Sequence, residues 1–304
     1  MILKTSRPYF YLLKSIRWQL LTVTVLAVAM GEVDGYLLDT YGFDFPIAIP
    51  AFMGTAIVFI LAFRTNQAYD RWWEARKVWG AIVNDSRSWT RMVINLIEDH
   101  PEDREEGVEL KRRLINRQVA WNYILAARLR GKDPLQGMAP YFTRQDFQVL
   151  EVVDNPNQAI LVMQSHDLKV ALDAGRLHGL HHIELEECAR HLEASMGKVE
   201  RIKHTHFPVL YDHMILFSIY IFSVLLSYAI VDRSTWFEAS FSIVISGLFL
   251  ALEKIASDMQ DPFEDLPTDT PITDISYTIE RGILQMAGET EMPDAPKQGK
   301  FYIN

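Results

Sequence analysis

The stretch between residues 178 and 191 contains side-chain types that bind transition metals. HGLHH at 178–182 is followed by Glu184, Glu186, Glu187, Cys188 and His191. His178 and His182 are four residues apart, a spacing that would place two imidazoles on one face of a helix. No glutamate lies between them, so the metalloprotease pattern is absent. The residues fit either a metal-binding membrane enzyme or a polar helix face, and both interpretations stay open.

A second set of carboxylates lies in and after DPFEDLP at 261–267. Its members are Asp261, Glu264, Asp265 and Asp269. Calcium takes about six to eight oxygen ligands, so this set gives only weak metal candidates and we expect no calcium regulation. Asp261 is explained equally well as a turn residue that ends a helix before Pro262. The sequence contains no phosphate loop, dinucleotide fingerprint or nucleophile beside a base, so we expect no catalytic residue and no cofactor.

The predicted elements that would position these residues include four apolar stretches. PIAIPAFMGTAIVFILAF at 46–63 has eighteen residues without a charge. A helix of that length would be roughly 27 Å long, nearly the thickness of a bilayer core. Further stretches cover 212–231 and, more weakly, 18–38 and 237–254. The sequence therefore predicts an all-α membrane protein with four transmembrane helices.

The charges beside these stretches predict their orientation, because cytoplasmic segments carry an excess of Lys and Arg. The segment 1–17 contains four bases, and four more follow between residues 64 and 77. The connector that ends in an outer loop at 39–45 has no base and four acids, Glu32, Asp34, Asp39 and Asp44. We therefore expect both termini and the segments 64–211 and 255–304 in the cytoplasm, and no cleavable signal peptide.

Residues 64–211 are predicted to form a helical cytosolic domain. Apolar residues at spacings of three and four run from Trp79 to Leu96 and indicate one buried face. The single cysteine, Cys188, excludes an internal disulfide framework. The net charge of −9 argues against a nucleic-acid partner.

Tryptophans and charges follow the charge-free stretch, in RWWEAR at 71–76. Tryptophan favours the boundary between membrane and water, so Trp72 and Trp73 mark the exit of the second span. Salt bridges are expected among Asp70, Arg71, Glu74 and Arg76.

The charge-free stretch itself has one distinctive face. Thr55, Phe59 and Phe63 follow one another at intervals of four and share one side of a helix. Gly54 and Ala62 are small enough to let neighbouring helices approach closely. One such helix encloses nothing, but several copies around an axis would enclose a narrow tube with rings of phenyl groups.

Two motifs resemble the bestrophin family of ion channels. FRTNQAYDRWWEAR at 63–76 resembles the segment after the pore helix in that family, and DPFEDLP resembles its second hallmark, an Asn/Asp-Pro-Phe turn before acidic residues. The motifs lie about 200 residues apart in the family's order. ERIKHTHFPVLY at 200–211 resembles the entrance to the third span in bacterial members, and the similarity covers most of residues 1–285.

The resemblance implies a homopentameric channel with its pore on the five-fold axis. The family's neck residues fall on Thr55, Phe59 and Phe63, its lower constriction falls on Leu180, and RWWEAR packs the base of the neck. The upper neck position is usually isoleucine, so Thr55 shortens the hydrophobic barrier by one ring. A pH response of His181 or His182 beside Leu180 is an additional interpretation.

The expected function is passive passage of monovalent ions across a bacterial inner membrane. The expected partners are further copies of the chain, the lipid bilayer and small inorganic ions. The acidic outer connector favours cations, whereas phenyl edges in the neck and hydroxyl donors on Thr55 favour anions. We expect chloride and other anions to be preferred, with a sodium-selective channel of the same fold as the alternative.

Overall fold

The computed structural model describes residues 8–41, 46–205, 208–230 and 235–294. Within these ranges the regular structure is helical, and β pairing is limited to an isolated bridge between Ile97 and Leu177. The chain divides into two compact units. The apolar unit contains residues 2–72 and 206–261, and the polar unit contains residues 73–205 and 262–304.

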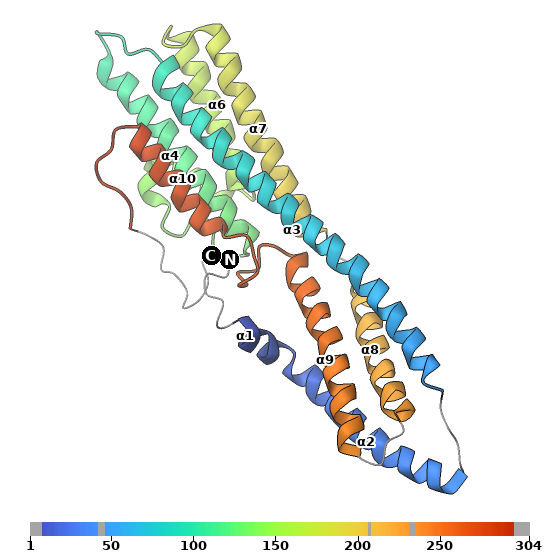
Figure 1. Cartoon of the computed structure of the whole chain (residues 1–304). Coiled ribbons are helices and arrows are strands. Elements are labelled where there is room, and N and C mark those ends of the chain that lie inside the picture. Colours follow the sequence, from blue (N-terminus) through green and yellow to red (C-terminus); the bar gives the residue numbers. More distant parts are fainter. Residues whose placement is uncertain (1–7, 42–45, 206–207, 231–234, 295–304) are drawn as a thin grey trace. The chain divides into compact units, whose positions relative to one another are not determined.

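The apolar unit consists of α1 (Pro8–Ser15), α2 (Arg17–Tyr41), the first part of α3 (Ala48–Leu96), α8 (Val209–Ala229) and α9 (Thr235–Gln260). Helices α2, α8 and α9 lie side by side and pack pairwise (Figure 1). Their common core includes Val23, Ile57, Leu61, Ile219, Phe222 and Leu250. Helix α3 therefore joins this core through one side only, the side that carries Ile57 and Leu61.

The surface of the apolar unit is apolar and part of its interior is polar. Trp18, Phe217 and Leu248 are more than half exposed on α2, α8 and α9. Between α8 and α9, the hydroxyls of Ser223 and Ser242 are buried and lie 3.3 Å apart, and Ser242 Oγ donates to Ser223 O at 3.1 Å. This distribution is typical of helices surrounded by lipid, where small polar residues join helices and apolar residues face outward.

Three of the described helices contain segments that are long and apolar enough to cross a membrane, namely Ala48–Leu96, Leu210–Ala229 and Ala239–Gln260. Within the described side chains, the apolar part of α2 is Arg17–Gly31, which is shorter than such a segment. Four spans therefore stay a prediction. Helix α2 also continues to Tyr41, so Asp39 lies on a helix and not in the loop expected at 39–45.

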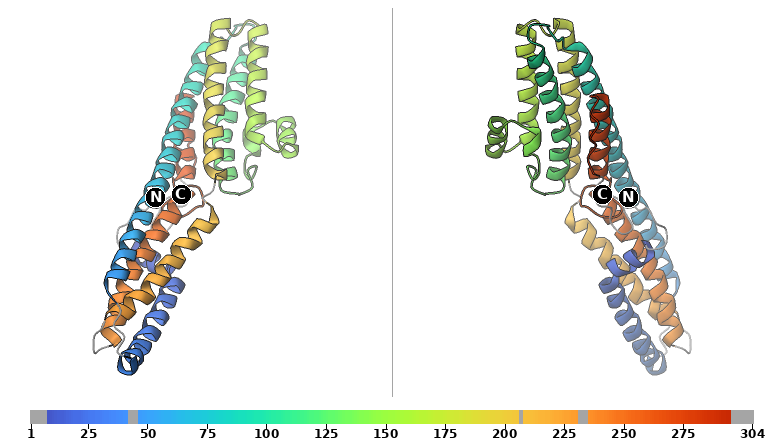
Figure 2. Two further views of the ribbon diagram at one scale, coloured as in Figure 1. Left: turned by 90° about the vertical axis from the view of Figure 1, so that its right-hand side faces the viewer. Right: turned by 90° about the vertical axis from the view of Figure 1, so that its left-hand side faces the viewer.

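The polar unit contains the remainder of α3 with α4 (Arg104–Leu129), the 3₁₀ turn η1 (Ala139–Tyr141), α5 (Arg144–Val152), α6 (Pro156–Asp173), α7 (Gly179–His204) and α10 (Ile272–Met286). Helices α4, α6 and α7 pack together, and α10 packs on α4 (Figure 2). The predicted stripe on α3 is confirmed as a core face, because Trp79, Ile82 and Trp89 are fully buried.

Candidate functional site

The predicted neck residues lie on the uncovered side of α3. Phe59 and Phe63 are 61% and 68% exposed, and Thr55 is exposed as well. The opposite side of the same helix approaches α8 so closely that a Cβ added to Gly54 would lie 3.0 Å from Phe222 Cε2. The face formed by Thr55, Phe59 and Phe63, hereafter the neck face, is thus left open by the packing of the single chain.

The hydroxyl of Thr55 is already used inside its own helix. Thr55 Oγ1 donates to the carbonyl oxygen of Ala51 at 2.9 Å. A hydroxyl has one proton, so this bond leaves only acceptor lone pairs for other partners. The expectation that Thr55 donates to a halide is therefore wrong for this conformation.

A buried arginine fixes α3 immediately after the neck face. The Arg64 side chain is fully buried, with Nη2 2.9 Å from Asp212 Oδ1 on α8 and Nη1 3.3 Å from Glu253 Oε1 on α9. The Gln260 amide, turned so that its oxygen faces the guanidinium, accepts from Arg64 Nε at 3.2 Å. One guanidinium thus joins α3 to two other helices. These contacts require one particular orientation of α3 about its own axis.

The sequence does not predict this cluster, because Asp212 lies at the start of the predicted span 212–231 and Glu253 near the end of another, 237–254. Arg64, Asp212 and Glu253 are far apart in the sequence, and charges at span ends normally point into water. The signal that was available is the position of Arg64 directly after eighteen charge-free residues. An ionisable residue at such depth needs a partner.

The RWWEAR segment makes contacts that differ from the expected salt bridges. Arg71 Nε donates to Gln260 O at 2.9 Å. Among the described residues, Glu74 pairs with Lys77 at 2.6 Å, one turn along the helix. The ring of Trp72 stacks on that of Tyr69 with centroids 6.0 Å apart, while Trp73 is 47% exposed and Arg76 is exposed. Of these residues, Arg71 joins α3 to the end of α9, and the packing role of the others stays a prediction.

The expected outer-mouth acids are only partly described. The backbone of Glu32, Asp34 and Asp39 belongs to α2. Asp44 lies outside the described residues. Their grouping around a pore mouth stays a prediction.

Leu180, the expected lower constriction, is the second residue of α7 and is 66% exposed. The residue before the helix is His178, whose Nδ1 accepts a hydrogen bond from the Leu180 amide at 3.3 Å. His178 is therefore the N-cap of α7, and the expectation that it shares a helix face with His182 is wrong. The local loop places the imidazole over the free amides at the helix start.

Two other histidines of the stretch, His182 and His191, lie near carboxylates, and the buried Nδ1 of His181 has no hydrogen-bond partner among the described residues. His182 Nε2 lies 3.9 Å from Glu186 Oε1, and His191 Nε2 lies 3.2 Å from Glu187 Oε1. Cys188 Sγ donates to the Asp85 carbonyl at 3.3 Å, and burial raises the pKa of its thiol to about 12. Across the described residues, no three His, Cys, Asp or Glu side chains come together as metal ligands would. The polar helix face is the interpretation that the structure favours.

The carboxylates after the Pro-Phe turn contact groups of the polar unit. Asp265 Oδ2 lies 2.7 Å from Lys132 Nζ, and its Oδ1 lies 3.4 Å from Arg130 Nη1. Asp269 Oδ2 accepts from the Leu266 amide at 3.0 Å. These contacts hold the turn in place and leave Glu264 exposed.

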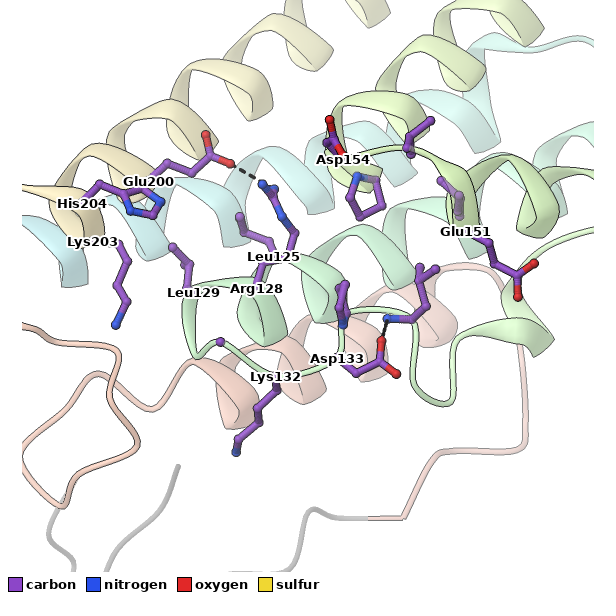
Figure 3. A pocket seen from close by; sticks show the side chains of 16 residues that line it. Leu125, Arg128, Leu129, Lys132, Asp133, Glu151, Asp154, Glu200, Lys203 and His204 are labelled. Atoms are coloured by element: carbon purple, nitrogen blue, oxygen red, sulfur yellow. Dashed lines mark hydrogen bonds and ion pairs between the residues drawn. The ribbon is translucent and has the colours of Figure 1, made fainter.

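The polar unit also contains a cavity of about 520 Å³ where the ends of α4 and α7 meet the loop after α4 (Figure 3). Its charged lining includes Arg128, Lys132, Lys203, Glu151, Asp154 and Glu200. Arg128 Nη1 lies 3.0 Å from Glu200 Oε1 within it. Asp133 also lines the cavity, so its lining mixes acidic and basic groups.

Comparison with known proteins gives one consistent family. A model of the bacterial and fungal bestrophin proteins matches residues 11–285. A voltage-dependent anion channel-forming protein of Escherichia coli O157:H7 is 30% identical over 261 residues, which cover 86% of this chain and 83% of that protein. A protein of the same description from Ralstonia nicotianae is 27% identical over 83% of this chain and 81% of its own length. The crystal structure of a bacterial bestrophin homologue from Klebsiella pneumoniae has the same fold, with a TM-score of 0.82, 24% identity and coverage of 91% of this chain and all of that one.

Proposed function

Because the chain belongs to the bacterial and fungal bestrophin family, we propose that it is an ion channel that passes monovalent ions passively through a membrane. The family is a channel family and not an enzyme family, and its curated relatives are named for channel formation. The chain is an integral membrane protein by family and by its apolar helices. A bacterial inner membrane with both termini in the cytoplasm fits the distribution of bases in the sequence.

The observation that carries the proposal is the uncovered neck face. Phenyl rings that are 61% and 68% exposed on a helix this apolar need either lipid or further protein around them. Copies of α3 arranged around an axis would place the two phenyl rings of each chain in a narrow hydrophobic constriction. Such constrictions gate channels by excluding water.

The surface beside the neck face supports assembly from several copies. An apolar groove of about 470 Å³ runs between α3 and α9 and is lined by Val58, Leu61, Ala62, Tyr69, Leu252 and Met259, among others. A neighbouring copy is its expected occupant, because in a ring every chain must present one side of α3 to the next. The proposed stoichiometry, a pentamer, comes from the family.

Selectivity for anions is the preferred form of the proposal. Phenyl rings seen edge-on present partial positive charge to an ion in the neck. The names of the curated relatives support the same sign. A cation-selective channel is the second candidate, and it is favoured by one observation, the hydrogen bond that removes the Thr55 proton from the neck. No cofactor is proposed, and calcium regulation is not expected because Asp265 and Asp269 already contact other groups.

The double variant Phe59→Ala/Phe63→Ala tests the proposal. Removing both rings should widen and wet the neck, so the initial rate of chloride flux from liposomes should rise above that of the unchanged protein. The matched control is Phe217→Ala/Phe241→Ala, which removes two exposed rings from α8 and α9. Equal flux from an assembled neck variant and the unchanged protein would place the barrier elsewhere, with Leu180 as the next candidate.

A further inference from the structure

Exposed apolar and basic side chains alternate at the start of the described chain. Phe10 and Leu13 on α1 are 75% and 56% exposed, and Trp18 on α2 is 65% exposed. Lys14 and Arg17 are exposed between them. The N-terminal patch, as we name it, consists of Phe10, Leu13, Lys14, Arg17, Trp18 and Leu21.

The patch faces away from the helices that pack beside it. Ile16, at the junction of α1 and α2, is 3% exposed and belongs to the core of the apolar unit, which fixes the direction of its neighbours. The Arg17 guanidinium lies over the Trp18 ring, 5.4 Å from its centroid. Within the described residues, neither Lys14 nor Arg17 contacts a carboxylate, so both positive charges are available to a partner.

The composition of the patch matches an anionic lipid more closely than a free anion. Phosphate is bound well by Lys and Arg, but a free ion would make no use of Phe10, Leu13 and Leu21. Tryptophan is enriched at the level of lipid headgroups, because its ring is apolar and its N–H is a donor. The patch is also continuous with the outward apolar side chains of α2, such as Val25 at 59% exposure.

We propose that the N-terminal patch is a binding site for an anionic phospholipid. Its phosphate contacts Lys14 and Arg17, its acyl chains lie against the apolar members of the patch, and Trp18 lies at the boundary between them. Each base near an anionic membrane surface contributes a modest attraction, so two bases should enrich anionic over zwitterionic lipid at the patch on the order of tenfold.

Quenching of Trp18 fluorescence by brominated lipids measures this preference directly. The full chain is reconstituted in phosphatidylcholine vesicles that contain a small fraction of brominated phosphatidylglycerol or, separately, the same fraction of brominated phosphatidylcholine. The chain has seven tryptophans, so each sample is compared with one that also carries Trp18→Phe, and the difference is the Trp18 signal. We expect stronger quenching by the anionic lipid.

In the variant Lys14→Gln/Arg17→Gln, both lipids should quench the Trp18 fluorescence equally. Its matched control, Lys169→Gln/Arg190→Gln, removes two exposed bases from α6 and α7 and should keep the preference. Inorganic phosphate should not compete beyond the effect of chloride at equal ionic strength. Three outcomes would each overturn the proposal. The first is equal quenching of the unchanged protein by the two lipids, and the second is a preference for the anionic lipid that persists in Lys14→Gln/Arg17→Gln. The third is an equal loss of that preference in the control variant. The readout involves no ion flux, so its outcome is independent of conduction.

Discussion

At the residue scale, the Arg64 guanidinium is the strongest constraint on the rotation of the neck face. Its side chain is fully buried between Asp212 and Glu253, and it directly follows Phe63. Removing one partner of a buried pair leaves an uncompensated charge, which costs far more than the pair contributes. The three residues belong to three helices, so their spatial relation could not be read from the sequence.

Arg64→Met should therefore destabilise the protein more than a change at Glu253. We expect a loss of about 3–5 kcal/mol in the free energy of unfolding, because the buried Glu253 and the partly exposed Asp212 would both lose their cation. Glu253→Gln should lose less, because Asp212 still pairs with Arg64 at 2.9 Å. Denaturant unfolding in detergent, followed by tryptophan fluorescence, measures both. Lys77→Met is the control, because its pair with Glu74 is exposed and worth under about 1 kcal/mol. Equal losses in all three variants would contradict this role for Arg64.

At the element scale, the sequence predicted helices well and their ends and partners less well. The apolar run at 46–63 and the stripe from Trp79 to Leu96 are local patterns, and the single helix α3 contains the stripe and the run from Ala48 onward. The spacing of four residues between His178 and His182 suggests that both lie on a helix, yet His178 is the N-cap residue before α7. Glu74 pairs with Lys77, a base outside the expected set of Asp70, Arg71, Glu74 and Arg76, and several bases lie within one turn of it. Local patterns determine helices, whereas rotamers and packing select among neighbouring partners.

Gly54 sets how closely α3 approaches α8. An added Cβ would lie 3.0 Å from Phe222 Cε2, a contact that the core can accept only if the ring or the helix moves. Gly54→Ala should reduce the free energy of unfolding by about 1–3 kcal/mol, as overpacking in cores does. Gly247→Ala is the comparison on α9, where the nearest atom would be Leu20 Cδ1 at 3.4 Å. Thermal unfolding should show a larger decrease in the midpoint for Gly54→Ala, and the reverse order would show that α3 and α8 are not in tight contact there.

At the scale of the whole molecule, a single chain does not enclose the pore that a channel requires. The neck face and the groove between α3 and α9 are both open, and a symmetric ring would cover both. Light scattering of detergent-solubilised protein should give about five protomer masses. Ala62→Trp, which fills the groove, should yield smaller species, whereas Val244→Trp on the outward face of α9 should not. A monodisperse monomer of the unchanged protein would remove the pore proposal.

The sign of the conducted ion depends on which part of the assembled molecule controls permeation. Acids in the C-terminal half of α2 would concentrate cations at the proposed outer mouth, but solvated charges are screened within about 8 Å at physiological salt. The proposed neck would be narrow and poorly screened, and phenyl edges that face its axis would favour anions. Because the Thr55 proton is engaged at Ala51, the phenyl rings alone carry this preference. The reversal potential of reconstituted protein in a NaCl gradient should therefore lie nearer the chloride than the sodium equilibrium potential, and Thr55→Val should leave it unchanged. A value near the sodium potential would show that the acids of α2 control selectivity and that the screening argument fails.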